Sequence, residues 1–442
     1  MRLFWAHPAR LVTLGFLLQV LVGTTVLMLP VSRAPGAPAD LLVAAFTTVS
    51  ATCVTGLITV DTATYWSPFG HVVIMGLIQT GGIGVMTLAT LLALKVRGRL
   101  GLRTSLAAQA DSHSLDLTDL RGVLVRVVRL ALAIEVVVAV LLTLRLRLGY
   151  DLGWPQALWH GVFHAVSAFN NAGFALYSDN LIGFVGDIWI IGPVCAALVL
   201  GGLGFPVLRE LLRGRRPSRW SVHTTMTVWG SAVLVVVGVA VFWVFEAGRG
   251  GTLAGMSPWQ QAVGALGGGV FPRTAGFNAV DYAAVTDEVE AVTIVLMFIG
   301  GGSAGTAGGI KVTTFLLLAA VIWSEVRGEP DVVVGRRRVG SAVQRQALTV
   351  ALLAVGLVIS STILLMTLTD LEPLDLGFEV VSAFATVGLS TGITHQLPAA
   401  GQVVLMVLMF VGRVGPITVA SALAINTRHR HYRFPKERPI VG

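Results

Sequence analysis

Four glycines recur at similar intervals in this 442-residue chain, each near the end of a short apolar segment. Gly56, Gly173, Gly276 and Gly388 are 117, 103 and 112 residues apart. Glycine readily takes a positive φ, so carbonyl groups beside it can turn toward one side of the chain. A ring of such carbonyls can replace the hydration shell of a cation. The spacing therefore predicts ion binding by backbone oxygens.

The stretches around these glycines align with one another. Residues 46–57, 163–174 and 378–389 each begin with Phe, carry Val-Ser-Ala in the middle and end in Gly followed by Leu or Phe. The copy at 266–277 keeps the Gly-Phe end and lacks Val-Ser-Ala. Thr386 to Leu389 is close to the Thr-Val-Gly-Tyr stretch of potassium channels. The ion-binding residues predicted in these four glycine segments are Val54, Thr55, Gly56, Asn171, Ala172, Gly173, Thr274, Ala275, Gly276, Thr386, Val387 and Gly388.

A second glycine-rich stretch runs from Gly300 to Lys311 inside a long apolar run. Each glycine costs a helix about 1 kcal/mol relative to alanine, which predicts a flexible loop within the apolar run. A phosphate-binding loop needs Gly-Lys-Ser/Thr, but here Ile310 separates Gly309 from Lys311 and apolar flanks replace the expected strand. A close-packed helix contact through small residues remains the alternative.

The composition places these motifs in a membrane. Hydrophobic residues make up 55% of the chain and charged residues 12%, against about 25% charged in soluble domains. About 20 apolar residues are needed for one helical span. We predict an all-α membrane protein whose eight spans lie near residues 10–30, 71–94, 124–148, 186–208, 222–245, 291–322, 346–368 and 401–425.

The connections that hold the glycine segments are long and start with proline. Pro38, Pro155, Pro258 and Pro373 precede the four glycines by 18, 18, 18 and 15 residues, where proline suits the first turn of a helix. A helix of about 12 residues rises about 18 Å, so it enters half of the bilayer and the chain must return. We predict four parallel helix–pore loop–helix repeats around a single pore, with boundaries at 1–94, 95–212, 213–325 and 326–442.

The basic residues predict the orientation. Of 31 Lys and Arg, 24 lie in the N-terminus, 95–129, 209–219, 327–345 and the tail from Arg428. Lys and Arg favour the cytoplasmic side, so both termini are expected inside. The net charge of +8 is interpreted as membrane topology and contact with anionic lipid, and a nucleic-acid partner is not expected. Glu135 in the third span is either a proton relay or a partner for a polar group of a neighbouring helix.

The fourfold repeat, with a glycine in every pore loop, resembles the potassium-transporter superfamily that includes the bacterial Trk and Ktr membrane subunits and the plant HKT proteins. Eight spans without an extra N-terminal helix pair are most similar to the Ktr membrane subunit. The resemblance implies potassium uptake across a bacterial plasma membrane, either passive or sodium-assisted, and Gly56 in place of serine implies a preference for potassium. It also implies a homodimer and a separate cytosolic ring of nucleotide-binding regulatory subunits. Neither the resemblance nor the residues imply an organic cofactor.

In that superfamily the loop in the sixth span lies under the selectivity filter as a gate. The resemblance assigns this role to Gly300, Gly301, Gly302, Ser303, Gly305, Thr306, Gly308, Gly309, Lys311 and Arg413. Arg413, in the last span, is predicted to repel cations at the narrowest inner point and to pair with carbonyls of the loop; reaching the inner surface is the alternative.

Two other classes of protein were considered. A secondary transporter with alternating access would use the broken sixth span as its binding site, but four matched parallel repeats argue against it. The chain contains no Ser-His-Asp, paired-carboxylate or Cys-His pattern, so an enzyme is not expected.

Overall fold

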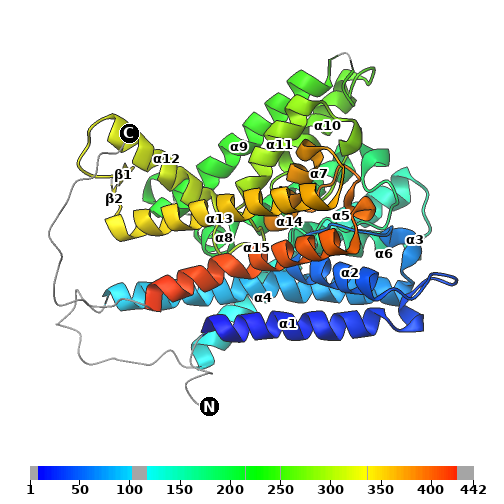
Figure 1. The fold of residues 1–442 in the computed structure, drawn as a ribbon, viewed down its shortest axis with the longest axis horizontal. Helices are drawn as coiled ribbons and strands as arrows, with labels where there is room; N and C mark the ends of the chain where they lie inside the picture. The colour runs from blue at the N-terminus through cyan, green and yellow to red at the C-terminus, as the bar shows by residue number, and fades with distance from the viewer. Residues whose placement is uncertain (1–7, 102–116, 215, 249, 336, 426–442) are drawn as a thin grey trace.

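The computed structural model describes residues 8–101 and 117–425, apart from 215, 249 and 336. This part of the chain is almost entirely helical, with one antiparallel pair of short strands, β1 (Val333–Val334) and β2 (Arg337–Arg338). Helices from the two ends of the chain lie side by side along the long axis of the molecule (Figure 1). The N-terminus and the tail from Arg428, both predicted to be cytoplasmic, lie outside the described residues.

The helices repeat the predicted pattern four times: a long helix, a half-length helix, an irregular stretch and a second membrane helix. The first two repeats contain α1 (Pro8–Leu27), α2 (Leu41–Cys53), α3 (Thr62–Tyr65) and α4 (Pro68–Gly101), then α5 (Leu117–Gly149), α6 (Trp154–Phe169), α7 (Ile188–Leu203) and α8 (Phe205–Leu212). The last two contain α9 (Val222–Glu246), α10 (Pro258–Val270), α11 (Asp287–Phe298) and α12 (Val312–Val326), then α13 (Ser341–Leu368), α14 (Pro373–Phe384) and α15 (Ala399–Ile425). The predicted fold class is confirmed, whereas the repeat boundaries remain a prediction.

The half-length helices α2, α6, α10 and α14 have 13, 16, 13 and 12 residues. Proline lies in the first turn of the last three, as expected. The expectation was wrong for Pro38, because α2 begins three residues later, where the side chain of Asp40 accepts the N–H groups of Leu42 and Val43. The third half-length helix forms despite its weaker motif, and Ser257 and Gln260 close a capping box at its start.

The fourth predicted span, 186–208, is not one helix. It breaks at Gly204, and α7 and α8 meet there at an angle of 105°. Gly204 has φ of +89° and ψ of 150°, a backbone conformation that residues with a side chain avoid. A side chain at this position would also run into the backbone of Ser303. The break therefore results from the close approach of the glycine-rich loop.

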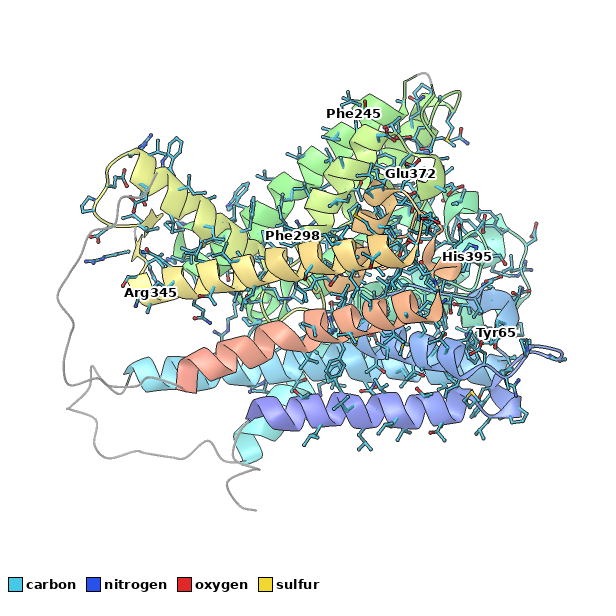
Figure 2. All side chains as sticks on the ribbon, in the orientation of Figure 1. Tyr65, Phe245, Phe298, Arg345, Glu372 and His395 are labelled. Carbon is cyan, nitrogen blue, oxygen red and sulfur yellow. The ribbon has the colours of Figure 1, made fainter. Side chains whose placement is uncertain are left out.

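The sixth predicted span is interrupted, as expected from its glycines. The chain between α11 and α12 turns back on itself, and its two ends pair through the N–H of Gly300 and the carbonyl of Ile310, 2.8 Å apart. Phe298, the last residue of α11, lies about midway between Arg345 at one end of the molecule and His395 at the other (Figure 2). The loop is therefore at mid-depth in the helical bundle.

The remaining predicted spans all coincide with helices. Among the described residues, four helices are long and apolar enough to cross a membrane by themselves, and the bent pair α7 and α8 would add a fifth. Three shorter apolar helices cover the first, sixth and last predicted spans over Thr13–Leu27, Val312–Val326 and Ala399–Gly415. The structure thus supports an integral membrane protein with broken as well as continuous spans.

Candidate ion-binding site

The four glycine segments share an unusual backbone conformation. Their glycines all have positive φ, at 97°, 71°, 68° and 94° in chain order. In every segment the residue two positions earlier is also left-handed, although none of these is glycine. They are Val54, Asn171, Thr274 and Thr386, with φ of 58°, 61°, 68° and 50°. Such conformations are costly outside glycine, and their occurrence at four equivalent positions indicates a common local structure.

The four segments meet around one axis. A methyl group on any of the four glycines would come within 2.7 Å or less of the carbonyl oxygen that precedes the glycine of a neighbouring segment. The four pairs, glycine first, are Gly56 with Ala172, Gly173 with Ala275, Gly276 with Val387 and Gly388 with Thr55. The pairs close a ring from the first repeat to the fourth and back to the first. The structure therefore brings the predicted ion-binding residues together.

Serine side chains fix two of the four glycines. Ser50 Oγ accepts the N–H of Gly56 and Ser382 Oγ accepts the N–H of Gly388, each at 3.0 Å. Ser167 occupies the same position in the second repeat, but its buried hydroxyl has no hydrogen-bond partner among the described residues. The third repeat has Val270 there. The serine of the Val-Ser-Ala pattern thus holds the glycine six residues later in two repeats, a contact that the pattern alone does not predict.

Two buried hydroxyl groups belong to the first and fourth glycine segments. The hydroxyl groups of Thr55 and Thr386 are buried and make no hydrogen bond within the described residues. Buried hydroxyls normally have a partner, so an unpartnered pair beside aligned carbonyls marks a place where another species can bind. A cation fits this place, because every group available to coordinate it is an oxygen atom.

The glycine-rich loop, residues 300–310, packs against the broken fourth span. The N–H of Gly302 donates to Gly202 O at 2.8 Å, and the N–H of Thr306 donates to Gly201 O at 3.1 Å. The N–H of Phe205 in turn donates to Ala304 O at 3.2 Å. The glycines predict a flexible loop, but hydrogen bonds hold it in the structure. The reason is that glycine also allows close backbone approach, and here N–H groups of the loop donate to carbonyls exposed at the break of the fourth span, while the N–H of Phe205 donates to a carbonyl of the loop.

Several loop residues contact the glycine segments directly. The Thr306 hydroxyl donates to Asn171 Oδ1 at 2.9 Å and to Phe169 O at 3.2 Å, at the C-terminal end of α6. Gly308 lies against Ala385 at the corresponding end of α14, where no side chain would fit. The loop is therefore directly beside two of the four glycine segments.

The remaining predicted gate residues lie within or next to the loop. Lys311 Nζ donates to the carbonyls of Ala307 and Gly308, at 2.6 and 3.3 Å. Ser303 Oγ is 3.4 Å from the hydroxyl of Thr313 in α12. The other glycines pack against backbone from two sides: Gly301 and Gly305 against Gly202, and Gly309 against Gly300 and Ala385.

Arg413 in α15 also contacts the loop. Its side chain is 3% exposed, so it does not extend to the inner surface. The guanidinium donates to Thr306 O, and a second nitrogen lies 3.5 Å from Gly81 O in α4. The predicted contact with a loop carbonyl is thus present.

Glu135 lies behind the second glycine segment. Both carboxylate oxygens accept from Gln79 Nε2 in α4 at 2.9 Å, and one accepts from Asn170 Nδ2 at 3.2 Å. Asn170 is the C-cap of α6 and immediately precedes Asn171. Of the two interpretations left open, the structure favours pairing with polar groups of neighbouring helices.

Four repeats of helix, half-length helix and helix around a shared ring of carbonyls define a membrane transport protein for ions. Residues 16–431 match the TrkH family model, described as a cation transport protein, and the chain belongs to this family. The predicted resemblance is confirmed. Because its relatives are transporters, the expectation that the chain is not an enzyme is confirmed as well.

Similar proteins cover nearly the whole chain. The Ktr system potassium uptake protein B of Bacillus subtilis is 36% identical over 98% of this chain and 97% of its own. The protein of the same name from Vibrio alginolyticus is 35% identical over 98% and 94%, and the potassium/sodium uptake protein NtpJ of Enterococcus hirae is 32% identical over 98% and 97%. The crystal structure of the potassium transporter TrkH from Vibrio parahaemolyticus shares the fold, with a TM-score of 0.70 and 18% identity over 92% of this chain and 84% of that one.

Proposed function

We propose that this protein takes up potassium across a bacterial plasma membrane through the ring formed by its four glycine segments. The observation that carries the proposal is the closure of that ring: each glycine lies against the carbonyl that precedes the next glycine. Carbonyl oxygens held at fixed positions replace the hydration shell of a dehydrated cation. A side chain at any of the four glycines would displace the backbone of a neighbouring segment, which supports a lining of peptide oxygens at these positions.

The choice of ion rests on the relatives and on the first segment. The two Ktr relatives described above are named potassium uptake proteins, and NtpJ is named a potassium/sodium uptake protein. Gly56 stands where the family resemblance associates a serine with sodium permeation, which supports potassium as the main transported ion. Transport is passive or assisted by sodium.

The glycine-rich loop is proposed as the gate, with Arg413 as a fixed positive charge beside it. The loop lies against the C-terminal ends of α6 and α14, which supports a place for it on the path of an ion that leaves the ring. A buried guanidinium on this path repels a cation and holds the loop through Thr306. Opening then requires the loop and Arg413 to separate.

The setting of the protein is also part of the proposal. The distribution of basic residues supports cytoplasmic termini and inner connections at 95–129, 209–219 and 327–345. The relatives' description as parts of a Ktr system supports a multi-component system with a regulatory subunit, and the family resemblance adds that this subunit is cytosolic and binds nucleotides. We expect this subunit to contact the basic inner connections of a dimer of this chain.

Replacement of Gly56 by serine tests the proposed ring. The added side chain would meet the carbonyl of Ala172, so the spacing of the oxygens must change and discrimination against sodium should weaken. The measurement is the ratio of potassium to sodium uptake in liposomes that contain the purified protein, supported by growth of a potassium-uptake-deficient host at low potassium. Gly356→Ser in α13, with no atom within 4 Å of the added carbon, is the control. Equal ratios for Gly56→Ser and the unchanged protein would refute the proposed ring.

A further inference from the structure

A second buried arginine contacts the glycine-rich loop, and it comes from the third glycine segment. Arg273 is 8% exposed and lies directly before Thr274. Its Nη1 donates to Ile299 O at 3.1 Å and its Nη2 to Gly300 O at 3.0 Å. Arg273 lies outside the basic inner segments predicted from the sequence, and the structure buries it beside the loop.

We propose that Arg273 is a positioning residue that holds the first limb of the loop, Ile299 and Gly300, in the closed arrangement. Arg413 holds the middle of the loop at Thr306. This inference rests on the proposed gating role of the loop. The two arginines come from different repeats and approach different parts of one segment. Release of the loop would therefore require both sets of contacts to break.

The geometry of the Arg273 contact suits this role. A guanidinium is planar and presents several N–H groups in a rigid fork, so it can bind two successive carbonyls at once, which a lysine ammonium cannot do in the same way. Neither Arg273 nor Arg413 forms an ion pair with an acid in the described part of the chain. Loop carbonyls are thus the main groups that compensate these buried charges, and hydrogen bonds from a charged donor are stronger than neutral ones.

The contact between Arg273 and the first limb also connects to the other end of the loop and to two glycine segments. The N–H of Gly300 donates to Ile310 O, so the two ends of the loop are paired and fixing one fixes the other. The backbone of Arg273 leads directly into Thr274, whose hydroxyl accepts from Asn171 Nδ2 at 3.3 Å. Asn171 Oδ1 in turn accepts from Thr306 in the middle of the loop. The same residues therefore link the closed loop to the second and third glycine segments.

A small cavity beside Arg273 makes the inference testable by substitution. It has a volume of about 20 Å³ and is lined by Arg273, Gly301, Ser231 and Val270, among others. This is enough for one water molecule. In a variant with a shorter side chain, water can solvate the carbonyls of the first limb, so we expect the protein to fold.

The first test measures ion flux. Arg273→Gln keeps a polar side chain but loses the charge and the fork, and we expect potassium flux into liposomes to rise about tenfold, equivalent to about 1.4 kcal/mol. Arg273→Lys should give a smaller increase, because one ammonium group can still bind one of the two carbonyls. Arg33→Gln is the matched control: Arg33 donates to a carbonyl, Ala37 O, in the outer connection of the first repeat. Unchanged or reduced flux in both Arg273 variants, with thermal stability close to that of the unchanged protein, would overturn the inference.

The second test separates the loop from the glycine segments. In a protein whose loop has been shortened, Arg273→Gln should have no further effect on flux, and the potassium-to-sodium ratio should be the same in both backgrounds. If Arg273→Gln raises the flux equally in the proteins with the full and the shortened loop, Arg273 acts on the ring and the inference is overturned. The same holds if Arg273→Gln alters the potassium-to-sodium ratio without altering the flux. If shortening the loop does not itself raise the flux, the proposed gate fails, whatever Arg273 does. Should Arg273→Gln fail to fold, the same comparison with Arg273→Lys decides.

Discussion

Replacement of Ser50 by alanine removes the acceptor for the N–H of Gly56 in the first glycine segment. The N–H and Ser50 Oγ are 3.0 Å apart, and both residues are fully buried. A buried donor left without a partner costs about 1–3 kcal/mol. If that cost falls entirely on the arrangement that binds the ion, potassium affinity decreases about 5- to 150-fold, since about 1.4 kcal/mol corresponds to a factor of ten.

The same position in the second repeat supplies the control. Ser167 is equally buried, but its hydroxyl has no hydrogen-bond partner among the described residues. Ser167→Ala removes an atom of the same kind from an equivalent place without leaving the N–H of Gly173 any less satisfied. We therefore expect Ser167→Ala to change affinity little, and Ser382→Ala to behave like Ser50→Ala, because Ser382 binds Gly388 in the same way.

The assay is the concentration dependence of potassium uptake by the purified variants in liposomes, with thermal unfolding measured in parallel. A decrease in affinity for Ser50→Ala and Ser382→Ala, but not for Ser167→Ala, would support the contacts as described. Equal changes in potassium affinity for all three variants, or no change for any of them, would refute the reasoning. The hydrogen bonds of Ser50 and Ser382 would then have no effect on affinity that Ser167 lacks.

Two further predictions concern the surroundings of the ring. Arg413→Ala should raise potassium flux in liposomes by about tenfold or more, because the loop loses its contact at Thr306 and the path loses a positive charge; wild-type flux would contradict the proposed role. Glu135→Ala should lower the free energy of unfolding by about 1–3 kcal/mol, because the amides of Gln79 and Asn170 lose their acceptors, with Glu135→Gln less affected; equal melting temperatures for both variants and the unchanged protein would contradict this.

The convergence of the four segments could be predicted because it depends on spacing along the chain. Four glycines occupy equivalent positions, and each follows an apolar stretch that is too short to cross the membrane. This pattern requires four equivalent segments that enter half of the bilayer and return. The third repeat formed its half-length helix although Val-Ser-Ala is missing, because the cap at Ser257 and the apolar run were sufficient. Local signals of this kind are readable from sequence.

Contacts between distant side chains could not be predicted in the same way. The direction in which Arg273 points depends on where α10 and α11 pack, and no pattern in residues 266–277 indicates it. The break at Gly204 was missed because the apolar run continues through it, and only the approach of Ser303 makes a straight helix impossible there. The start of α2 differed because Asp40, a strong N-cap residue, outweighed Pro38.

The location of the bound ion can be measured directly with rubidium, a heavier stand-in for potassium, by anomalous diffraction from crystals of the protein. The four carbonyls of Thr55, Ala172, Ala275 and Val387 surround one axis. A rubidium peak on this axis, lost when sodium replaces rubidium, is the expected result. Rubidium bound elsewhere in the protein, with none between the four glycines, would contradict the proposal that these segments form the ion pathway.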